Sequence, residues 1–502
     1  MALTKEWLQL KNGSDIRGVA SEGVEGSPIN LTDKKTYRIA VAFAQWLKNR
    51  LNKENIKIAL GHDSRISAER LKKACISGFI DSGVFVLDCG MCTTPAMFMT
   101  CVDKEISADG SVMITASHLP FNRNGLKFFT QEGGLESSDI TEILELAQNG
   151  ELKETKNGSV QSVDFLKIYS ESIINKIVTE TNNKNPLKGF KIAVDAGNGV
   201  GGFYAEILKK LGADISGSVF LEPDGMFPNH VPNPEDKKAM EAISKAVIQS
   251  KSDLGIIFDT DVDRAAIVDS EGREINKNRL IALISAILLK DKKGTIVTDS
   301  VTSAGLKEFI EKDLKGCHHR FKRGYKNVIN EAIRLNKEGI YCPLAIETSG
   351  HAALKENHFL DDGAYLVTKI LIEMINLKSQ GKNIFELISS LKEANISYTF
   401  RIPIETEDFK TYGQKVIDDL YSYIKDIEGF EIEKENYEGI RVNLGADGKR
   451  GWFLLRLSLH DPILPLDIES DSREDANYII KSLVNFFEKY DKLNIETLLR
   501  KE

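Results

Sequence analysis

The sequence predicts an α/β protein of four domains, three of them related and the fourth a smaller α+β domain. First, 502 residues are too many for one ordinary hydrophobic core. Second, one pattern of apolar strand, polar loop and amphipathic helix recurs three times along the chain. Third, the C-terminal stretch lacks this pattern and shows several strands in succession.

The recurring unit is clearest in residues 55–83, 189–213 and 294–312. In each, a short apolar run leads into a polar or glycine-rich turn, and a helical pattern follows. Strands that alternate with helices at these lengths form largely parallel sheets, because each helix returns the chain to the same edge of the sheet. The repetition therefore predicts three related α/β domains in tandem.

The C-terminal stretch begins near Ser397 with a strand, a turn and a helix. Two further strands follow, RGWFLLRLSL and LPLDIES, and a helix, ANYIIKSLVNFFEKY, closes the pattern. Such an order predicts a smaller α+β domain. We place the four domains, in chain order, at residues 1–155, 156–272, 273–393 and 394–502.

Composition and charge argue against several classes of partner. Hydrophobic residues make up 42% and charged residues 28%, as in globular proteins. The net charge of −8 argues against a nucleic-acid partner, which requires a basic face. The longest apolar run, residues 280–289, is about half of a spanning helix, so we expect a buried helix there and no membrane partner.

Cysteine usage and the N-terminus predict a cytoplasmic protein. Six cysteines in this length do not form a dense disulfide framework, and the first residues lack the apolar core of a signal peptide. The single CxxC, Cys89 to Cys92, has no second pair at zinc spacing. We interpret it as two small buried side chains.

The stretch ITASHLPFNRNGLKFF places a hydroxyl, an imidazole and an amine on one shaped loop, at Ser117, His118 and Lys127. Proline, asparagine and glycine residues between them are typical of a tight turn. Because Ser117 and His118 are adjacent, we do not expect their side chains to converge as a nucleophile and its base.

GIIFDTDVDRAAIVD carries the strongest chemical signal. An apolar strand runs straight into Asp259, Asp261 and Asp263, and Arg264 follows. Three neighbouring carboxylates repel one another unless a cation lies among them. Hard oxygen ligands favour Mg²⁺ over zinc, so we favour a magnesium site over the alternative, a solvated acidic turn at a strand end.

Two further regions carry polar side chains in clusters. IETSGHAA contains Glu347, Thr348, Ser349 and His351, which suit the hydroxyls of a sugar, although a helix cap explains them equally well. RGYKNVI contributes Lys326, among cationic and turn-forming residues.

LRLSLHDP combines Arg456, Ser458 and His460 at alternate positions, which on a strand would face one way. Arginine together with a hydroxyl is typical of a phosphate site. A polar sheet face explains the alternation equally well, and the residues alone leave both interpretations open.

Taken in chain order, these segments resemble the α-D-phosphohexomutase family, which includes phosphoglucomutase and phosphomannomutase. The resemblance covers nearly the whole chain and implies the four-domain architecture of that family. The motifs that carry it are SDIRG (14–18), TASHLPFNRNGLKF (115–128), VDAGNGVGG (194–202), NHVPNPE (229–235), FDTDVDR (258–264), ETSGH (347–351) and DDG (361–363).

The resemblance implies that the chain interconverts the 1- and 6-phosphates of glucose or mannose. Ser117 matches the serine that carries a phosphoryl group, and Lys127 matches the lysine that acts as general acid or base. His118 shapes the phosphate environment, and His351 acts near the substrate. A hexose 1,6-bisphosphate is then the intermediate and the activator.

The resemblance also implies one Mg²⁺ per chain, bound by Asp259, Asp261, Asp263 and the phosphoserine. Hexose phosphates are the expected partners, and the chain is expected to be a monomer or a homodimer. The implied substrate-binding residues are Arg17, Arg264, Lys326, Glu347, Thr348, Ser349, Arg456, Ser458 and His460.

Three departures from the family pattern leave the sugar open, and one of them is Leu119, where Asn is usual in the phosphoserine loop. Most members carry R-x-S-G-T where this chain has Leu459 and His460 in the last two places, so we expect phosphate binding through altered contacts, with His460 as a donor. Thr348 stands where relatives often show Met, Glu or Gln. An amino sugar, as in a phosphoglucosamine-type mutase, is therefore an alternative substrate.

Two alternatives lie outside the mutases. An apolar strand ending in Asp259-x-Asp261 is also typical of aspartyl-phosphate hydrolases, but that function leaves the Ser117 loop without a role. A non-catalytic sugar-phosphate-binding protein on the same fold is disfavoured, because the serine, the lysine and all three aspartates are present.

Overall fold

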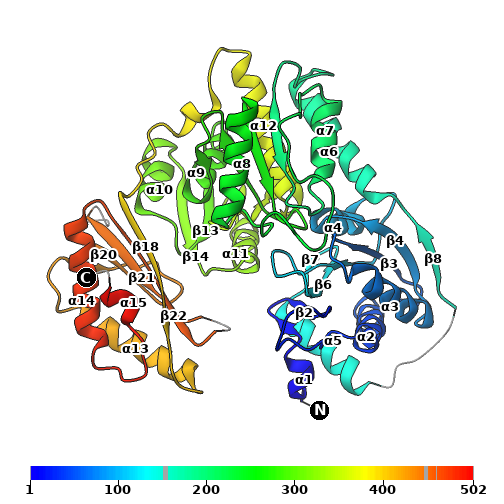
Figure 1. Cartoon of the computed structure of the whole chain (residues 1–502), viewed down its shortest axis with the longest axis horizontal. Coiled ribbons are helices and arrows are strands. Elements are labelled where there is room, and N and C mark those ends of the chain that lie inside the picture. The colour runs from blue at the N-terminus through cyan, green and yellow to red at the C-terminus, as the bar shows by residue number, and fades with distance from the viewer. Residues whose placement is uncertain (1, 151–156, 446–449, 459–460, 501–502) are drawn as a thin grey trace. The chain divides into compact units, whose positions relative to one another are not determined.

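The computed structural model describes residues 2–150, 157–445, 450–458 and 461–500. They form two compact units, whose residues can be followed by the colour of the ribbon in Figure 1. Unit 1 contains residues 1–276 and 349–384, and unit 2 contains residues 277–348 and 385–502. The chain therefore passes from one unit to the other after residues 276, 348 and 384.

The first sheet of unit 1 has the strand order β1-β2-β6-β5-β3-β4-β8, and β7 pairs with β6. Its centre is parallel, whereas β6 runs antiparallel to both β5 and β2. The strands are β1 (Lys11–Asn12), β2 (Asp15–Val19), β3 (Lys57–His62), β4 (Phe85–Met91), β5 (Gly110–Ile114), β6 (Arg123–Thr130), β7 (Gly133–Gly134) and β8 (Ser159–Ser162).

Helices cover both faces of this sheet, which explains why its strands are apolar on both sides. Ile58 and Leu60 of β3 join the core beneath α2, α3 and α5. Gly61 faces α4 instead, since an added Cβ would lie 2.5 Å from Met97 Sδ. The helices are α1 (Lys5–Leu8), α2 (Asp33–Leu51), α3 (Ala68–Asp81), α4 (Thr94–Val102), α5 (Ser137–Asn149) and α6 (Phe165–Thr181).

The second sheet of unit 1 has the order β12-β11-β10-β9. β9 and β10 are parallel, and β10 and β11 form an antiparallel pair. Helix α8 packs on one face, and α12 contacts β11 and α6. The strands are β9 (Ile192–Asp195), β10 (Leu254–Phe258), β11 (Ala265–Asp269) and β12 (Glu274–Ile275). The remaining elements of unit 1 are α7 (Gly202–Lys210), α8 (Lys237–Ser250), β16 (Ala352–Leu354), η2 (Lys355–Asn357), β17 (Leu360–Asp361) and α12 (Gly363–Lys378).

Unit 2 begins with the buried helix expected at residues 280–289, which is α9 (Lys277–Leu288). Strand β13 lies between β14 and β15, and both pairings are parallel. The strands are β13 (Thr295–Asp299), β14 (Cys317–Phe321) and β15 (Leu344–Ile346). The helices that follow α9 are α10 (Ala304–Glu308), the π-helix η1 (Phe309–Asp313), α11 (Tyr325–Lys337) and η3 (Ile384–Ile388).

The C-terminal sheet is antiparallel, in the order β18-β22-β21-β20-β19. Helices α13 and α14 pack on it around one hydrophobic core, as Figure 1 shows in orange and red. Its elements are β18 (Ile396–Pro403), α13 (Phe409–Ile424), β19 (Phe430–Ile432), β20 (Ile440–Leu444), β21 (Gly451–Leu455), β22 (Ile463–Ser470), α14 (Arg473–Phe487) and α15 (Glu496–Leu499).

Three α/β sheet domains and a separate C-terminal sheet confirm the predicted fold class. The first sheet includes β8, beyond the proposed boundary at residue 155. In the part of the chain that the structure describes, no helix has both the length and the apolar character needed to cross a bilayer. Cys89 and Cys92 are buried free thiols, and burial raises the pKa of both.

Candidate active site

Ser117 follows the central strand β5, and Lys127 lies on the neighbouring strand β6, opposite Met113. Ser117 is 1% exposed, and its backbone adopts a φ of +52°. A non-glycine residue in this left-handed region costs roughly 1 kcal/mol or more. The contacts around Ser117 must therefore hold it in place.

The aspartate loop lies between β10 and β11 and is buried. Asp259 and Asp261 are 0% exposed and Asp263 is 2% exposed, so a solvated acidic turn is excluded. One carboxylate oxygen from each lies within 4.8 Å of the others. Burial, and then the charges of Asp263 and Asp261, raise the pKa of Asp259 well above its ordinary value. All three carboxylates can ionise together only beside a cation.

The donor set of this loop fits a divalent metal. Asp261 Oδ1 and Asp263 Oδ1 are buried and accept no hydrogen bond from any described residue. A buried oxygen without a partner is costly, whereas a hard divalent cation takes such oxygens as ligands. The structure therefore supports the predicted position of a metal site.

The Ser117 loop contacts the aspartate loop directly. Ser117 Oγ donates to Asp259 Oδ2 at 3.0 Å. Lys127 Nζ forms an ion pair with Asp263 and lies 3.5 Å from Asp261 Oδ2. Burial alone would raise the pKa of Asp263, but the ammonium of Lys127 holds it well below its ordinary value. Residues predicted from two distant segments are thus brought together.

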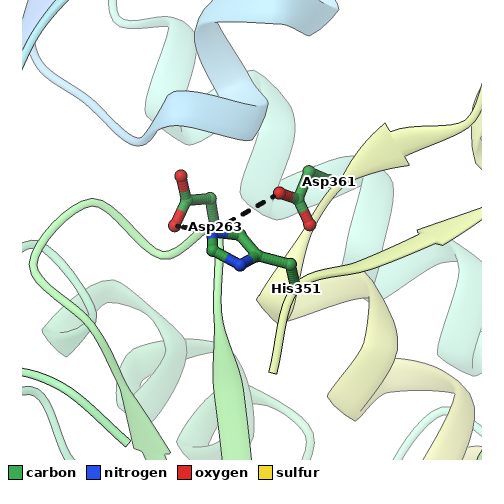
Figure 2. Close-up of side chains that lie close together, drawn as sticks. All are labelled: Asp263, His351 and Asp361. Carbon is green, nitrogen blue, oxygen red and sulfur yellow. Dashed lines mark ion pairs between the residues drawn. The ribbon is translucent and has the colours of Figure 1, made fainter. Parts of the chain in front are cut away.

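A second group that could hold a metal, Asp263, His351 and Asp361, is drawn in Figure 2. His351 Nε2 lies 3.7 Å from an oxygen of each aspartate. However, Arg264 Nε donates to that same nitrogen at 3.1 Å, so its lone pair is already used. Ser349 Oγ lies 2.8 Å from His351 Nδ1, which carries the proton of the neutral ring. Of the two groups, the three aspartates are therefore the better fit to a metal ion.

His351 is neutral in this setting. Burial, and next the guanidinium of Arg264, lower the pKa of His351 well below its ordinary value. Its main contacts bridge Arg264, next to the aspartate loop, and Ser349, in the predicted sugar loop.

The expectation that Ser117 and His118 keep their side chains apart is wrong. Ser117 Oγ lies 3.3 Å from His118 Nδ1, because the left-handed backbone at Ser117 turns the two side chains toward each other. Arg264 Nη2 also approaches that nitrogen, at 3.2 Å. Burial, and then Arg264 and Arg17, lower the pKa of His118 to about 3, so the ring is neutral.

The two predicted arginines of unit 1 flank these loops. Arg17 lies on β2 and forms an ion pair with Asp15 at 2.9 Å. The backbone N–H of Arg264 donates to Asp259 Oδ1 at 3.2 Å, and its Nη1 lies 3.3 Å from Glu235 Oε2. Both guanidiniums add positive charge near Ser117, which suits a phosphoryl group.

In unit 2, the predicted sugar residues follow β15. Glu347 accepts a hydrogen bond from the N–H of Gly324 at 2.6 Å, just before α11 begins. Thr348 Oγ1 donates to Asp299 Oδ2 at 2.8 Å. Lys326 lies in the first turn of α11. Because Gly324 bonds to Glu347, the segment after β14 and the segment after β15 are neighbours.

The predicted phosphate segment begins directly after β21, which ends at Leu455. The backbone N–H groups of Arg456 and Ser458 donate to Pro465 and Ile463, each at 3.1 Å. These two bonds continue the pairing of β21 with β22 beyond Leu455, so Arg456 and Ser458 keep the alternate placement considered for this segment. His460 and Leu459 lie outside the described residues.

Arg456 has a cationic neighbour that the predicted set omitted. Burial, and then the charge of Arg323, lower the pKa of Arg456. Arg323 precedes Gly324, and its Nε lies 4.0 Å from Asp299 Oδ2. The cationic, turn-forming composition of RGYKNVI was the signal that could have identified Arg323.

Sequence reasoning also missed residues that hold the Ser117 loop and the aspartate loop. Arg65, in the GHDSR segment, donates to the carbonyls of the Ser117 loop. Gly363, in the DDG motif, donates to Val262, a β-branched residue at φ +66° within the aspartate loop. The residues were visible in the sequence, but their partners lie far away along the chain.

Three family models match the chain in order. They are described as the alpha/beta/alpha domains I, II and III of phosphoglucomutase/phosphomannomutase, and they match residues 8–154, 167–272 and 276–394.

Curated relatives match nearly the whole chain. It is 32% identical over 467 residues to a phosphoglucomutase of Neisseria meningitidis serogroup A, covering 91% of this chain and 92% of the relative. It is 30% identical over 482 residues to a phosphoglucomutase/phosphomannomutase of Thermococcus kodakarensis, covering 94% and 97%.

A solved structure shares the fold. The crystal structure of a phosphoglucomutase/phosphomannomutase family protein from Burkholderia thailandensis superposes with a TM-score of 0.79 at 24% identity. The match covers 97% of this chain and 98% of that chain.

Proposed function

Because this chain belongs to the phosphoglucomutase/phosphomannomutase family, we propose that it interconverts the 1- and 6-phosphates of glucose or mannose through a phosphoserine at Ser117. Family membership makes the chain a phosphohexomutase, an isomerase that acts on sugar phosphates. The phosphoserine, the bisphosphate intermediate and the choice of sugar are parts of the proposal.

One observation carries the mechanism: Ser117 Oγ donates to Asp259 inside a buried group of three aspartates. In the first half of the reaction, the bond between phosphorus and Ser117 Oγ breaks and a bond to a free sugar hydroxyl forms. In the second half, the other phosphoryl group of the 1,6-bisphosphate transfers to Ser117 Oγ and leaves the isomeric monophosphate. Lys127 in its neutral form relays the proton: it takes the proton of the attacking sugar hydroxyl and passes it to Ser117 Oγ, and in the second half it passes the proton of Ser117 Oγ to the departing sugar oxygen.

The cation in this proposal is Mg²⁺, held by Asp259, Asp261, Asp263 and an oxygen of the phosphoserine. The all-oxygen donor set and the two buried oxygens without hydrogen bonds favour it. When bound, it neutralises charge on the transferring phosphoryl group.

His118 and Arg17 keep the surroundings of the phosphoserine ordered and positive, since the neutral His118 ring accepts from Arg264 and both arginines lie nearby. His351 acts near the substrate, where it orients the Ser349 hydroxyl. Hydrogen bonds to the sugar hydroxyls come from the residues of the ETSGH loop, and the phosphate of the sugar is held by cations and hydroxyls. The proposed substrate-binding residues are Arg17, Arg264, Lys326, Glu347, Thr348, Ser349, Arg456, Ser458 and His460.

The proposal places the enzyme in the cytoplasm, as a monomer or homodimer that acts on small hexose phosphates. The free cysteines and the acidic net charge are consistent with that setting. An amino-sugar phosphate is the alternative substrate, and a sugar-phosphate binder without activity is the alternative function.

Phosphorus NMR tests the proposal. The protein is given Mg²⁺, a trace of hexose 1,6-bisphosphate, and glucose 1-phosphate or mannose 1-phosphate. We expect a growing 6-phosphate signal from the wild type and none from Ser117→Ala. Ser111→Ala is the matched control, because Ser111 is similarly buried on the preceding strand and its hydroxyl donates to Met97 O at 2.7 Å, away from the aspartate loop.

Each other outcome has a defined meaning. Free phosphate in place of 6-phosphate would favour hydrolysis. A 6-phosphate signal that survives in Ser117→Ala would refute the phosphoserine. If neither sugar phosphate is converted, the amino-sugar phosphates are supplied next. If these also remain unconverted, the result would favour a sugar-phosphate-binding protein without activity.

A further inference from the structure

A single buried arginine gathers the carbonyls of the Ser117 loop. The side chain of Arg65 is 0% exposed. Its Nη1 donates to the carbonyls of Pro120 at 2.7 Å and Arg123 at 2.9 Å. Its Nη2 donates to the carbonyls of Leu119 at 2.6 Å and Ser117. Four carbonyl groups of one loop therefore converge on one guanidinium.

Asp63 fixes the backbone N–H of Ser117 through Thr115. Asp63 Oδ2 accepts from Thr115 Oγ1 at 2.7 Å, and Thr115 Oγ1 accepts in turn from the N–H of Ser117 at 2.9 Å. Asp63 also accepts from the N–H of Arg65 at 2.9 Å and lies 3.2 Å from Arg65 Nε. Arg65 thus holds the C=O of Ser117 directly, and Asp63 holds its N–H through the Thr115 hydroxyl.

A segment between α7 and α8 packs against the pair. The ring centre of Phe227 lies 5.1 Å from Arg65 Cζ. An added Cβ at Gly225 would lie 2.4 Å from the backbone N of Ile66, so the two backbones are in direct contact. Hydrogen bonds in such a dry setting are stronger and more directional than in water.

The geometry points to Arg65, together with Asp63, as a positioning residue for phosphoryl transfer. The pair holds Ser117 at its left-handed φ, and this conformation directs Oγ to Asp259. The inference rests on the proposed function and adds to it the residues that aim the nucleophile. Among the described residues, no hydrogen bond or ion pair joins Arg65 or Asp63 to the three aspartates, although the charge of Asp261 acts on both, so their hydrogen bonds reach the site through Ser117.

Arginine suits this position better than lysine does. A guanidinium directs five N–H donors in a fixed plane, and the loop presents four carbonyls around it. An ammonium has three donors on a flexible stem and cannot serve all four carbonyls. A displacement of about 1 Å at a reacting atom can cost on the order of 10²-fold in rate.

The test uses Thr115→Val, because Arg65 is fully buried and its variants risk misfolding. Thr115→Val keeps the shape of the side chain and removes the hydroxyl between Asp63 and Ser117. We expect kcat to fall by about 10- to 100-fold while KM stays within about twofold. Thr115→Ser restores the hydroxyl and should restore kcat to within about threefold of the wild type.

Thr100→Val is the matched control for lost stability. Thr100 is as buried as Thr115, and its hydroxyl donates to Met97 O at 2.7 Å, away from Ser117. It should lower Tm but leave kcat unchanged. Arg65→Lys, where it folds, should behave like Thr115→Val.

The assay also separates this inference from the proposed function. A wild type that makes no hexose 6-phosphate would overturn both. A wild type that does so, with Thr115→Val at an unchanged kcat, would overturn the positioning role alone. A loss of kcat that Thr115→Ser fails to restore would also overturn it.

Discussion

Replacing Lys127 by methionine removes the cation that balances the aspartate loop. Lys127 is 5% exposed, pairs with Asp263 and lies 3.5 Å from Asp261 Oδ2. Methionine fills a similar volume without the charge. Removing one partner of a buried ion pair leaves the other charge unpaired, which costs about 3–5 kcal/mol.

That cost converts to a large shift in Tm. In a domain of 150–250 residues, 1 kcal/mol lowers Tm by roughly 2–4 °C, so Lys127→Met should unfold roughly 6–20 °C below the wild type in EDTA. A divalent cation replaces the missing positive charge. Mg²⁺ should therefore stabilise Lys127→Met more than it stabilises the wild type, although the variant should be inactive.

Differential scanning calorimetry in EDTA and in Mg²⁺ measures both quantities on the first unfolding transition. Lys72→Met is the control, because Lys72 pairs with Asp88 and the largely exposed Glu69, a kind of pair worth about 1 kcal/mol or less. A Lys127→Met protein that unfolds within 2 °C or so of the wild type in EDTA would refute the reasoning. So would equal stabilisation of both proteins by Mg²⁺.

Two further predictions concern the support of the site. In Gly363→Ala, the new Cβ would lie 2.6 Å from the carbonyl of Arg264, so we expect a loss of about 1–3 kcal/mol and weaker Mg²⁺ binding by calorimetry. In the control Gly134→Ala, the new Cβ would meet no atom closer than 3.6 Å, so neither the stability nor the Mg²⁺ affinity should change. Burial opposes the charge of His230, but Asp195 at 3.0 Å raises the pKa of His230 overall. The stabilisation from this pair is complete below the pKa of the unfolded state, about 6.5, and is lost as pH rises through the pKa of His230 in the folded state. The Tm of the wild type should therefore fall above neutral pH, whereas the Tm of His230→Asn should not.

The sequence allowed prediction of those features that depend on local patterns. The strand–turn–helix units, the buried helix at residues 280–289 and the group of three aspartates all follow from side chains that are close along the chain. For the same reason, the apolar run before Asp259 indicated a strand that ends in a metal-binding loop.

The remaining features depend on contacts between distant segments. The approach of His118 to Ser117 requires the left-handed backbone at Ser117, which Arg65 stabilises from 52 residues away. His351 is occupied by Arg264, 87 residues away. A periodic pattern in the sequence cannot predict such contacts, because each one depends on the conformations of two loops that are distant along the chain.

The division of unit 1 into two stretches of chain has a consequence for biosynthesis. Tyr169 donates to Asp362 at 2.7 Å, and the hydroxyl of Tyr204 lies 2.8 Å from that of Thr368. Both tyrosines are buried, yet their partners are translated only after the intervening residues 277–348. A nascent chain that has reached residue 276 already contains α7 and α8, but the face of β11 that packs against α12 stays uncovered until α12 is made. A recombinant fragment ending near residue 272 would carry an exposed apolar face, so α12 must be included in any fragment made for expression.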